Sequence, residues 1–204
     1  MVDPAILRLV AITDDAEDQR STLVDRVAAS VRGGATSVQV RLKTASAREV
    51  VEITRAIMGK VSVPVIVNDR ADIALAAGAA GVHVGEADLP VSAIRRFAPA
   101  AFIIGASLGG DTELANAKDA DYVGIGPVFS SDSKSDAGAA IGVAGFKRLA
   151  DLVQVPAIAV GGITPDRAMQ ITVNGAAGVA VINAIFRAAD PETATRALAA
   201  AIGK

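Results

Sequence analysis

Short apolar runs alternate along this chain with stretches in which apolar residues recur at helical spacing. The runs are continuous rather than alternating, which is typical of parallel strands that are buried on both faces. Eight runs are present, each followed by enough chain for a helix: Leu9–Thr13, Ser37–Val40, Pro64–Val67, Gly81–Gly85, Ala101–Gly105, Tyr122–Gly126, Ala157–Val160 and Gly178–Asn183. This alternation predicts an α/β fold, a (β/α)₈ TIM barrel that forms a single domain over residues 1–204.

Helix starts are marked by capping residues and prolines. Ser46 is a good N-cap, and Glu49 follows three residues later, so the pair predicts a capping box. Pro90, Pro165 and Pro191 stand where helices are expected to begin. Proline is tolerated at the first helical position because the missing N–H would have been unpaired there anyway.

The composition is consistent with one core and a soluble setting. A chain of 204 residues with 51% apolar content buries one large core but is hard to divide into two. Barrels are seldom smaller, so the connections are expected to be short. No apolar stretch is long enough to span a membrane, and the chain reaches its first predicted strand too soon for a signal peptide. A cytoplasmic location is therefore expected.

Charge and cysteine content exclude several classes of function. The net charge of −2 argues against nucleic acid as the main partner. The chain has no cysteine, which excludes disulfides, thiolate catalysis and thiolate metal sites. If the ligand is an anion, its positive field must therefore be local.

A local positive field is predicted after the second strand. Gln39, Arg41 and Lys43 alternate along the chain, so their side chains point the same way as the strand leaves the core. The alternative is an ordinary solvated strand end. The neighbouring strands carry further polar residues, which favours a functional row.

Carboxylates follow the third and fourth strands. Asn68 and Asp69 follow the third run, and Asp88 follows the fourth. Asp69 could instead cap a helix that begins near Arg70. Two carboxylates on neighbouring strands, beside Arg41 and Lys43, suggest a magnesium ion shared with a phosphorylated substrate.

Two later loops have the composition of phosphate sites. The loop from Gly126 to about Gly142 is long and polar, and its serine hydroxyls and lysine suit phosphate oxygens; the alternative is a mobile surface loop. After the seventh strand, the pair Gly161–Gly162 frees backbone N–H groups to approach a ligand. Together with the end of the eighth strand, this is where barrels commonly bind a monophosphate.

These motifs together resemble the thiamine phosphate synthase family, which also includes the thiazole tautomerases, along nearly the whole chain. The resemblance rests on Gln39-Val40-Arg41-Leu42-Lys43, Asn68-Asp69-Arg70, Gly81–Gly85 with Asp88-Leu89-Pro90, Gly126–Phe129, and Gly161–Pro165. It implies a barrel that joins hydroxymethylpyrimidine diphosphate to a thiazole phosphate and releases pyrophosphate, with Mg²⁺ as cofactor. The expected partners are these small molecules, and a homo-oligomer is left open.

The resemblance also implies a role for each matching residue. Gln39 would bind the aminopyrimidine, and Asp69 with Asp88 would hold the metal. The diphosphate would be bound by Arg41, Lys43, Asn68, Ser107 and Lys134, of which Arg41, Lys43, Ser107 and Lys134 are the expected catalytic residues. The thiazole phosphate would be bound by Ser131, Ser133, Gly162 and the backbone near Ile182 and Asn183.

Some positions depart from the family pattern and keep two alternatives open. Asn183 stands where serine is frequent, Glu86 where glutamine is common, and Asp132 adds negative charge to a phosphate-binding loop. A catalytically silent ligand-binding relative is one alternative. The other is a tautomerase-like isomerase, but Leu108 stands near where that relative has a proton-carrying histidine. The lone His83 lies within an apolar strand, which favours a core or supporting role.

Overall fold

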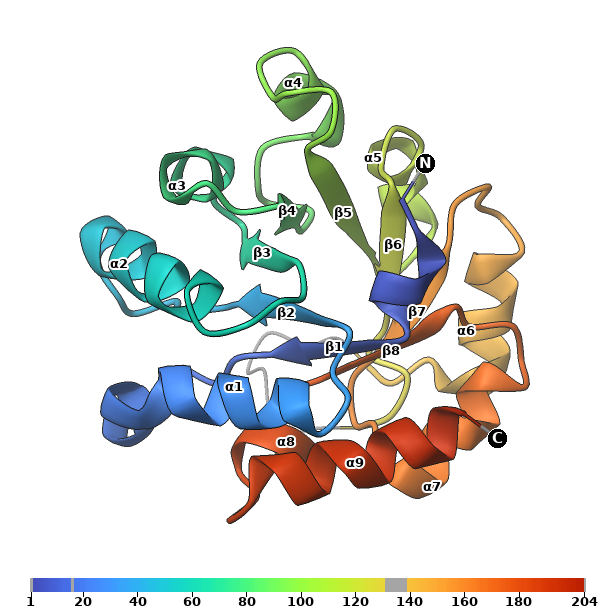
Figure 1. The fold of residues 1–204 in the computed structure, drawn as a ribbon. Helices are drawn as coiled ribbons and strands as arrows, with labels where there is room; N and C mark the ends of the chain where they lie inside the picture. Colours follow the sequence, from blue (N-terminus) through green and yellow to red (C-terminus); the bar gives the residue numbers. More distant parts are fainter. Residues whose placement is uncertain (1, 16, 131–138, 204) are drawn as a thin grey trace.

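The chain forms a closed barrel of eight parallel strands with helices around the outside (Figure 1). The computed structural model describes residues 2–15, 17–130 and 139–203. The strands are β1 (Leu9–Ile12), β2 (Ser37–Val40), β3 (Val65–Asn68), β4 (Gly81–Val84), β5 (Ile103–Leu108), β6 (Tyr122–Ile125), β7 (Ala157–Val160) and β8 (Gly178–Val181). Each strand pairs with the next, and β8 pairs with β1, which confirms the predicted (β/α)₈ TIM barrel.

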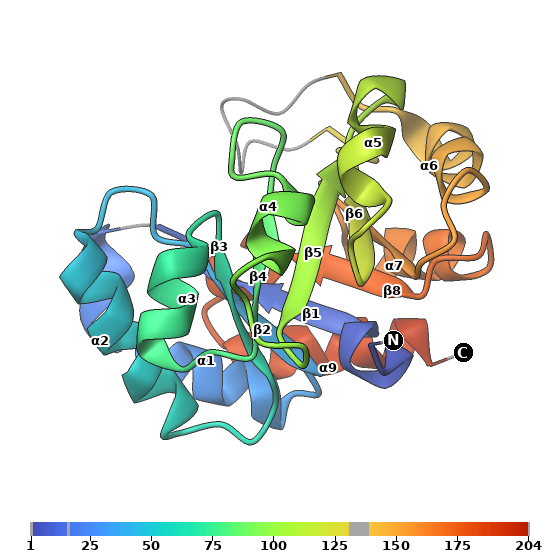
Figure 2. The ribbon, with the colours of Figure 1, turned by 90° about the horizontal axis from the view of Figure 1, so that it is seen from above.

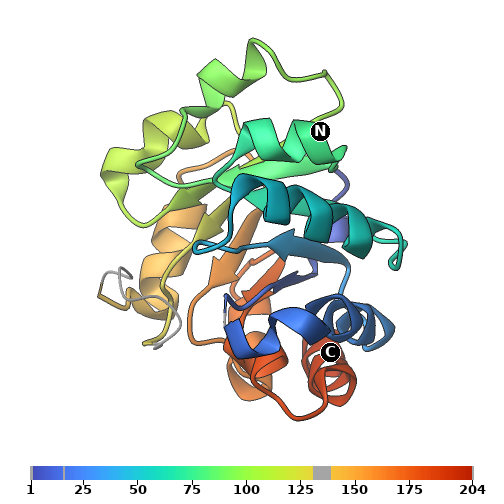
Figure 3. The same ribbon diagram turned by 90° about the vertical axis from the view of Figure 1, so that its left-hand side faces the viewer.

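The connecting helices cover the outer face of the barrel, as the side view in Figure 3 shows. Their bounds are α1 (Leu23–Arg32), α2 (Ala47–Met58), α3 (Ala71–Ala77), α4 (Val91–Arg95), α5 (Leu114–Ala117), α6 (Gly142–Ala150), α7 (Pro165–Thr172), α8 (Asn183–Phe186) and α9 (Pro191–Ile202). Short 3₁₀ segments cover Pro4–Leu7, Glu17–Thr22 and Asp111–Glu113. No helix in the described ranges is long and apolar enough to cross a membrane.

The helix starts follow the sequence signals in most cases. The Ser46 hydroxyl accepts a hydrogen bond from the Glu49 N–H at 3.3 Å, so the predicted N-cap of α2 is confirmed. The Glu49 carboxylate does not complete the box within the described contacts, because it pairs with Arg20 at 2.9 Å. Pro165 and Pro191 are the first residues of α7 and α9, as expected.

Several expected boundaries were wrong, including the end of the eighth strand, because β8 stops at Val181 and Asn183 begins α8. Pro90 is the N-cap of α4 rather than its first residue. The fifth strand was expected at Ala101–Gly105 but runs from Ile103 to Leu108. Ala101 is exposed, whereas the side chains of Ile104, Ala106 and Leu108 are fully buried at alternate positions, which extends the strand. Ser107 therefore lies within β5 and not after it.

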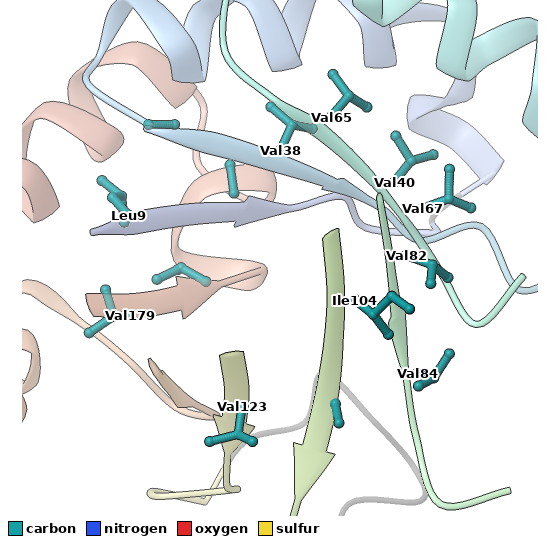
Figure 4. Packing of buried hydrophobic residues seen from close by; sticks show 14 of the residues in the cluster. Leu9, Val38, Val40, Val65, Val67, Val82, Val84, Ile104, Val123 and Val179 are labelled. Carbon is teal, nitrogen blue, oxygen red and sulfur yellow. The ribbon is translucent and has the colours of Figure 1, made fainter. Parts of the chain in front are cut away.

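Alternation along the strands divides the core into two layers. One set of side chains points away from the barrel axis and packs under the helices; it includes Val38, Val65, Val82, Val123 and Val179 (Figure 4). A smaller set fills the barrel interior: Val10, Ile12, Ile66, Tyr122, Ile158 and Ala180 with neighbours. Continuous apolar strands are the sequence consequence of burial on both faces.

All strands run in one direction, so their carboxyl ends meet at a single rim. Viewed from above in Figure 2, both chain termini lie at the opposite end of the barrel, where the strands begin. The loops at the rim are therefore free to build a site while the amino end is closed by terminal segments.

We expect the cap of α9 to be sensitive to pH. The Asp190 carboxylate accepts hydrogen bonds from the Glu192 N–H at 3.0 Å and the Thr193 hydroxyl at 2.6 Å, and the Thr193 bond is the main cause of its lowered pKa. A lowered pKa stabilises the fold above the unfolded value, and this stabilisation is lost as the pH falls through the folded pKa.

Asp190→Ala should therefore lower the melting temperature at neutral pH, and the gap to the wild type should shrink as the solution is acidified. Thermal melts of both proteins at neutral and acid pH measure this. Asp166→Ala, in the first turn of α7 without a capping bond, is the matched control. A gap that stays constant with pH would contradict the capping role.

Candidate active site at the carboxyl rim

A cavity of about 620 Å³ opens at the carboxyl ends of the strands. Every predicted site residue within the described part of the chain lines it: Gln39, Arg41, Lys43, Asn68, Asp69, Asp88, Ser107, Gly162, Ile182 and Asn183. Ser131, Asp132, Ser133 and Lys134 lie outside the described residues. The fold thus brings together side chains that lie as far apart in the sequence as Gln39 and Asn183.

The end of β2 is held rigidly. Gln39 is only 3% exposed, and its Nε2 donates to Oδ1 of Asn68 on β3 at 3.1 Å. The buried Thr13 hydroxyl accepts from the Arg41 N–H at 2.8 Å and donates to the Arg41 carbonyl at 3.0 Å. The backbone that carries Arg41 is therefore fixed to the end of β1, which keeps its side chain at the cavity.

Asp69 has an unusual backbone conformation. Its φ is +66°, in the left-handed region that costs a non-glycine residue about 1–2 kcal/mol. Its carboxylate accepts from the Asn68 side-chain amide and pairs with Lys43 Nζ at 2.5 Å. The helix α3 has Arg70 at its N-cap without a side-chain bond, so the alternative of Asp69 as a helix cap is excluded.

Asp88 brings a second carboxylate close to Asp69. Its Oδ2 accepts from the Gly85 N–H at 2.7 Å, which holds the loop after β4. Burial raises the pKa of Asp88, and the nearby negative charge of Asp69 raises it further. A cation held between the two carboxylates would stabilise the ionised form of Asp88.

The charges in the cavity are mostly negative. Among the described residues, the cationic lining side chains are Arg41 and Lys43, and the acidic ones are Asp69, Glu86, Asp88 and Glu113. No three His, Asp or Glu side chains within that part of the chain form a metal cluster on their own. A cation held here would need oxygens from water or from a bound anion, as Mg²⁺ commonly does.

The opposite side of the cavity is formed by backbone. Gly161 and Gly162 have φ values of +96° and +63°, and Arg167 donates to the Gly162 carbonyl at 2.8 Å. The Arg167 guanidinium also lies 4.7 Å from the centre of the Phe129 ring, which fixes the loop after β7 against the loop after β6. The turn therefore presents backbone N–H groups at a defined position, as anion sites require.

The backbone near Asn183 was predicted to bind phosphate, and the side chain of this residue carries one polar atom without a partner in the described part of the chain. Its Oδ1 is buried and has no hydrogen-bond partner among the described residues. A buried polar atom without a partner costs free energy unless a ligand or water satisfies it. The side chain lines the cavity beside Ile182, so it is within reach of a bound molecule.

Among the lining residues with polar side chains, the sequence reasoning missed Tyr122 and Glu113. His83 was expected to have a core or supporting role, and it lies on β4 with its ring nitrogens 3.1 Å from Tyr122 Oη and 3.2 Å from Ser107 Oγ. Tyr122 is the only tyrosine of the chain and stands within an otherwise apolar strand, so the sequence could have marked it as a candidate site residue. Glu113 accepts from the Gly109 N–H at 3.0 Å and gave no comparable signal.

The fold and the site define a class of protein. A parallel barrel with a polar cavity at its carboxyl rim is the architecture of a (β/α)₈-barrel enzyme. Paired carboxylates, two cationic side chains and a half-buried glycine turn point to substrates that carry phosphate groups.

Comparison with known proteins identifies the family. Residues 9–185 match the family described as thiamine monophosphate synthase. Thiamine-phosphate synthases from Roseiflexus castenholzii and Moorella thermoacetica are each 42% identical, over 92% and 93% of this chain and 84% and 92% of those proteins. A thiamine phosphate pyrophosphorylase from Pyrococcus furiosus has a solved structure with a TM-score of 0.86 and 33% identity, covering 98% of this chain and 97% of that one.

The chain belongs to the thiamine monophosphate synthase family, and its activity is thiamine-phosphate synthesis. The predicted resemblance and enzyme class are thereby confirmed. The roles of the individual site residues remain predictions.

The glycine turn provides a stability test. A Cβ at Gly162 would lie 2.7 Å from Phe129 Cβ and 2.7 Å from the Ser130 carbonyl oxygen, whereas a Cβ at Gly175, also at positive φ, meets nothing within 4 Å. Gly175→Ala should cost only the left-handed backbone penalty of about 1–2 kcal/mol.

Gly162→Ala should lower the free energy of unfolding clearly more than Gly175→Ala does. It should also weaken binding of inorganic phosphate, because the turn must move. Chemical denaturation and calorimetric titration measure the two effects. If both variants lose the same stability and phosphate affinity is unchanged, the close packing of the turn does not shape a ligand site.

Proposed function

We propose that this chain joins hydroxymethylpyrimidine diphosphate to thiazole phosphate, giving thiamine phosphate and pyrophosphate, with Mg²⁺ held by Asp69 and Asp88. The observation that carries the proposal is the pair of carboxylates beside Lys43 and Arg41 in one cavity. This arrangement suits a diphosphate leaving group that arrives with a divalent cation.

The donor set fits magnesium. Asp69 and Asp88 supply hard oxygen ligands, and burial together with mutual repulsion raises the pKa of Asp88, so a cation between them is favoured. When bound, Mg²⁺ would neutralise charge on the diphosphate as the bond between the pyrimidinylmethyl carbon and the diphosphate oxygen breaks. Thiolate ligands that would favour a softer metal are absent, because the chain has no cysteine.

Different side chains around the cavity would bind different parts of the two substrates. Gln39 and Asn68, which are hydrogen-bonded to each other, would bind the aminopyrimidine edge and the diphosphate. The leaving group would be held by Arg41, Lys43, Ser107 and Lys134, the last of which lies outside the described residues. The thiazole phosphate would lie against Gly162, Ile182 and Asn183, with Ser131 and Ser133 from the same undescribed segment.

The chemistry requires charge stabilisation rather than a strong base. Departure of pyrophosphate leaves a delocalised pyrimidinylmethyl cation, and the thiazole nitrogen is itself the nucleophile. Preorganised donors and cations lower the barrier by stabilising the negative charge that develops on the leaving oxygen. Removing one buried phosphate-binding cation would cost about 2–5 kcal/mol of transition-state stabilisation.

The two alternatives have less structural support. An isomerase would need a proton carrier near the end of β5. Leu108 is fully buried there, and its side chain has no group that can donate or accept a proton. A silent relative would keep ligand binding without turnover. The excess of carboxylates in the cavity is more useful to a metal-dependent reaction than to anion binding alone.

The first test is an assay of the purified protein with both substrates and Mg²⁺, following pyrophosphate and thiamine phosphate together. We expect the two products in equal amounts, and none after chelation. Binding of substrate without product would favour the silent relative. Isomerisation of a carboxylated thiazole without pyrophosphate release would favour the tautomerase.

A second prediction concerns the metal pair. Asp88→Asn keeps an oxygen that accepts from the Gly85 N–H but removes the charge, so the loop should stay in place. We expect the Mg²⁺ concentration for half-maximal activity to rise at least about tenfold, since even indirect perturbation of a metal site costs 10–100-fold. The melting temperature should not fall, because burial disfavours the ionised form of Asp88.

Glu86→Gln, an exposed neighbour in the same loop, is the control and should change the Mg²⁺ requirement little. Calorimetric titration of Mg²⁺ in the presence of pyrophosphate reports the same effect without turnover. Equal responses of the two variants would remove Asp88 from the metal site.

A further inference from the structure

Three polar side chains form a hydrogen-bonded chain across the interior of the barrel. His83 on β4 lies between Tyr122 on β6 and Ser107 on β5, with its Nδ1 3.1 Å from Tyr122 Oη and its Nε2 3.2 Å from Ser107 Oγ. The strand register aligns His83 with Gly105 and Gly105 with Tyr122. Because Gly105 has no side chain, the tyrosine reaches across β5 to the imidazole.

Two glycines fix the orientation of the imidazole. A Cβ at Gly105 would collide with the Tyr122 ring and lie 2.6 Å from His83 Nδ1. A Cβ at Gly124 on β6 would lie 3.1 Å from His83 Cε1. The ring therefore occupies a slot that only glycine at both positions leaves open, and its two nitrogens have defined partners.

A neutral imidazole allows the chain of hydrogen bonds to run in either direction. If the Tyr122 hydroxyl donates to Nδ1, then the Nε2–H donates to Ser107, and the Ser107 proton is free to point into the cavity. If the Nδ1–H donates to Tyr122, then Ser107 donates to Nε2 and offers only lone pairs to a ligand.

Burial of Tyr122 decides between the two directions. The side chain is 1% exposed, and His83 is the hydrogen-bond partner of its hydroxyl in the described part of the chain. A buried hydroxyl that accepted from Nδ1–H would leave its own proton without an acceptor, which is costly. A phosphorylated ligand in the cavity also needs donors and not lone pairs.

We propose that Tyr122 and His83 are positioning residues that hold the imidazole as its Nε2–H tautomer and thereby turn the Ser107 hydroxyl proton toward the diphosphate leaving group. The inference rests on the proposed function, because it assigns Ser107 an anionic partner. No proton is transferred along the chain. The two positioning residues only fix the direction of the hydrogen bond that Ser107 donates, before the negative charge develops.

The first experiment reads the tautomer directly. His83 is the only histidine of the chain, so two-bond ¹⁵N–¹H spectra of imidazole-labelled protein report on this residue alone. We expect a pyridine-type Nδ1 and a pyrrole-type Nε2 at neutral pH, with the Nδ1 signal moving on Tyr122→Phe as its donor is lost. Protonation at Nδ1 alone, or at both nitrogens, would overturn the proposal.

The second experiment is a kinetic double-mutant cycle on the full chain. Loss of a preorganised donor lowers kcat about 10²–10³-fold, so Ser107→Ala should lower kcat by a factor in this range. Tyr122→Phe only releases the orientation of the Ser107 hydroxyl, so it should lower kcat about tenfold. Tyr122→Phe should have no further effect in the Ser107→Ala background. A merely structural tyrosine would lower kcat by the same factor in both backgrounds.

Histidine variants give a matched control. His83→Gln retains an N–H donor in the direction of Ser107, so it should restore part of the kcat that His83→Ala loses, with KM for the thiazole unchanged. Equal loss in both variants, at equal melting temperature, would count against a donor role.

Failure of the proposed function would give a different pattern. In that case the wild-type protein releases no pyrophosphate from the two substrates, while the spectra still decide the direction of the hydrogen-bond chain. If the wild type is active but Ser107→Ala changes neither kcat nor pyrophosphate affinity, the positioning proposal is wrong and the synthase assignment stands.

Discussion

The parallel pairing of β1 with β8 is the constraint on which the rest of the structure depends, because it closes the sheet. Closure places the carboxyl ends of all strands on one rim. Seven strands have only four residues, so the last inward-facing side chain of a strand already belongs to the rim. Gln39 and Asn68 are such residues, and each is part of β2 or β3 rather than of a loop. Because β5 is longer, Ser107 also lies within its strand and reaches the rim.

The interior of the barrel changes character along its axis. Toward the amino ends it is packed with aliphatic side chains such as Val10, Ile66 and Ile158. Toward the rim, Gly105 and Gly124 omit side chains, and the space is taken by His83, Tyr122 and the cavity. Glycine in a strand costs stability through backbone entropy and lost packing. The fold tolerates this cost because a large buried cluster of apolar side chains forms the outer layer between strands and helices.

Much of this arrangement could be predicted from the sequence, since buried strands and the polar residues that end them leave a local pattern. The eight strands and the gathering of Gln39, Arg41, Asp69 and Asp88 at one cavity follow from that pattern. Contacts that depend on the stagger between neighbouring strands do not. The shift of β5 and the contact of Tyr122 with the imidazole are of this kind, because alternation within a strand does not reveal which residue faces it across the sheet. The conformation of Asp69 also escaped prediction, since an aspartate before a helix equally suggests a cap.

The electrostatics of the rim couple the cation to the anion. Lys43 Nζ lies 2.5 Å from Asp69 in the structure, so a diphosphate that recruits Lys43 leaves this carboxylate without its partner. A divalent cation at Asp69 and Asp88 would restore the balance and would itself be ligated by the diphosphate. Each ligand would therefore lower the free-energy cost of binding the other, and linkage requires the two effects to be equal. The protein thus needs no large positive surface, which agrees with a net charge of −2 on a chain that handles phosphorylated substrates.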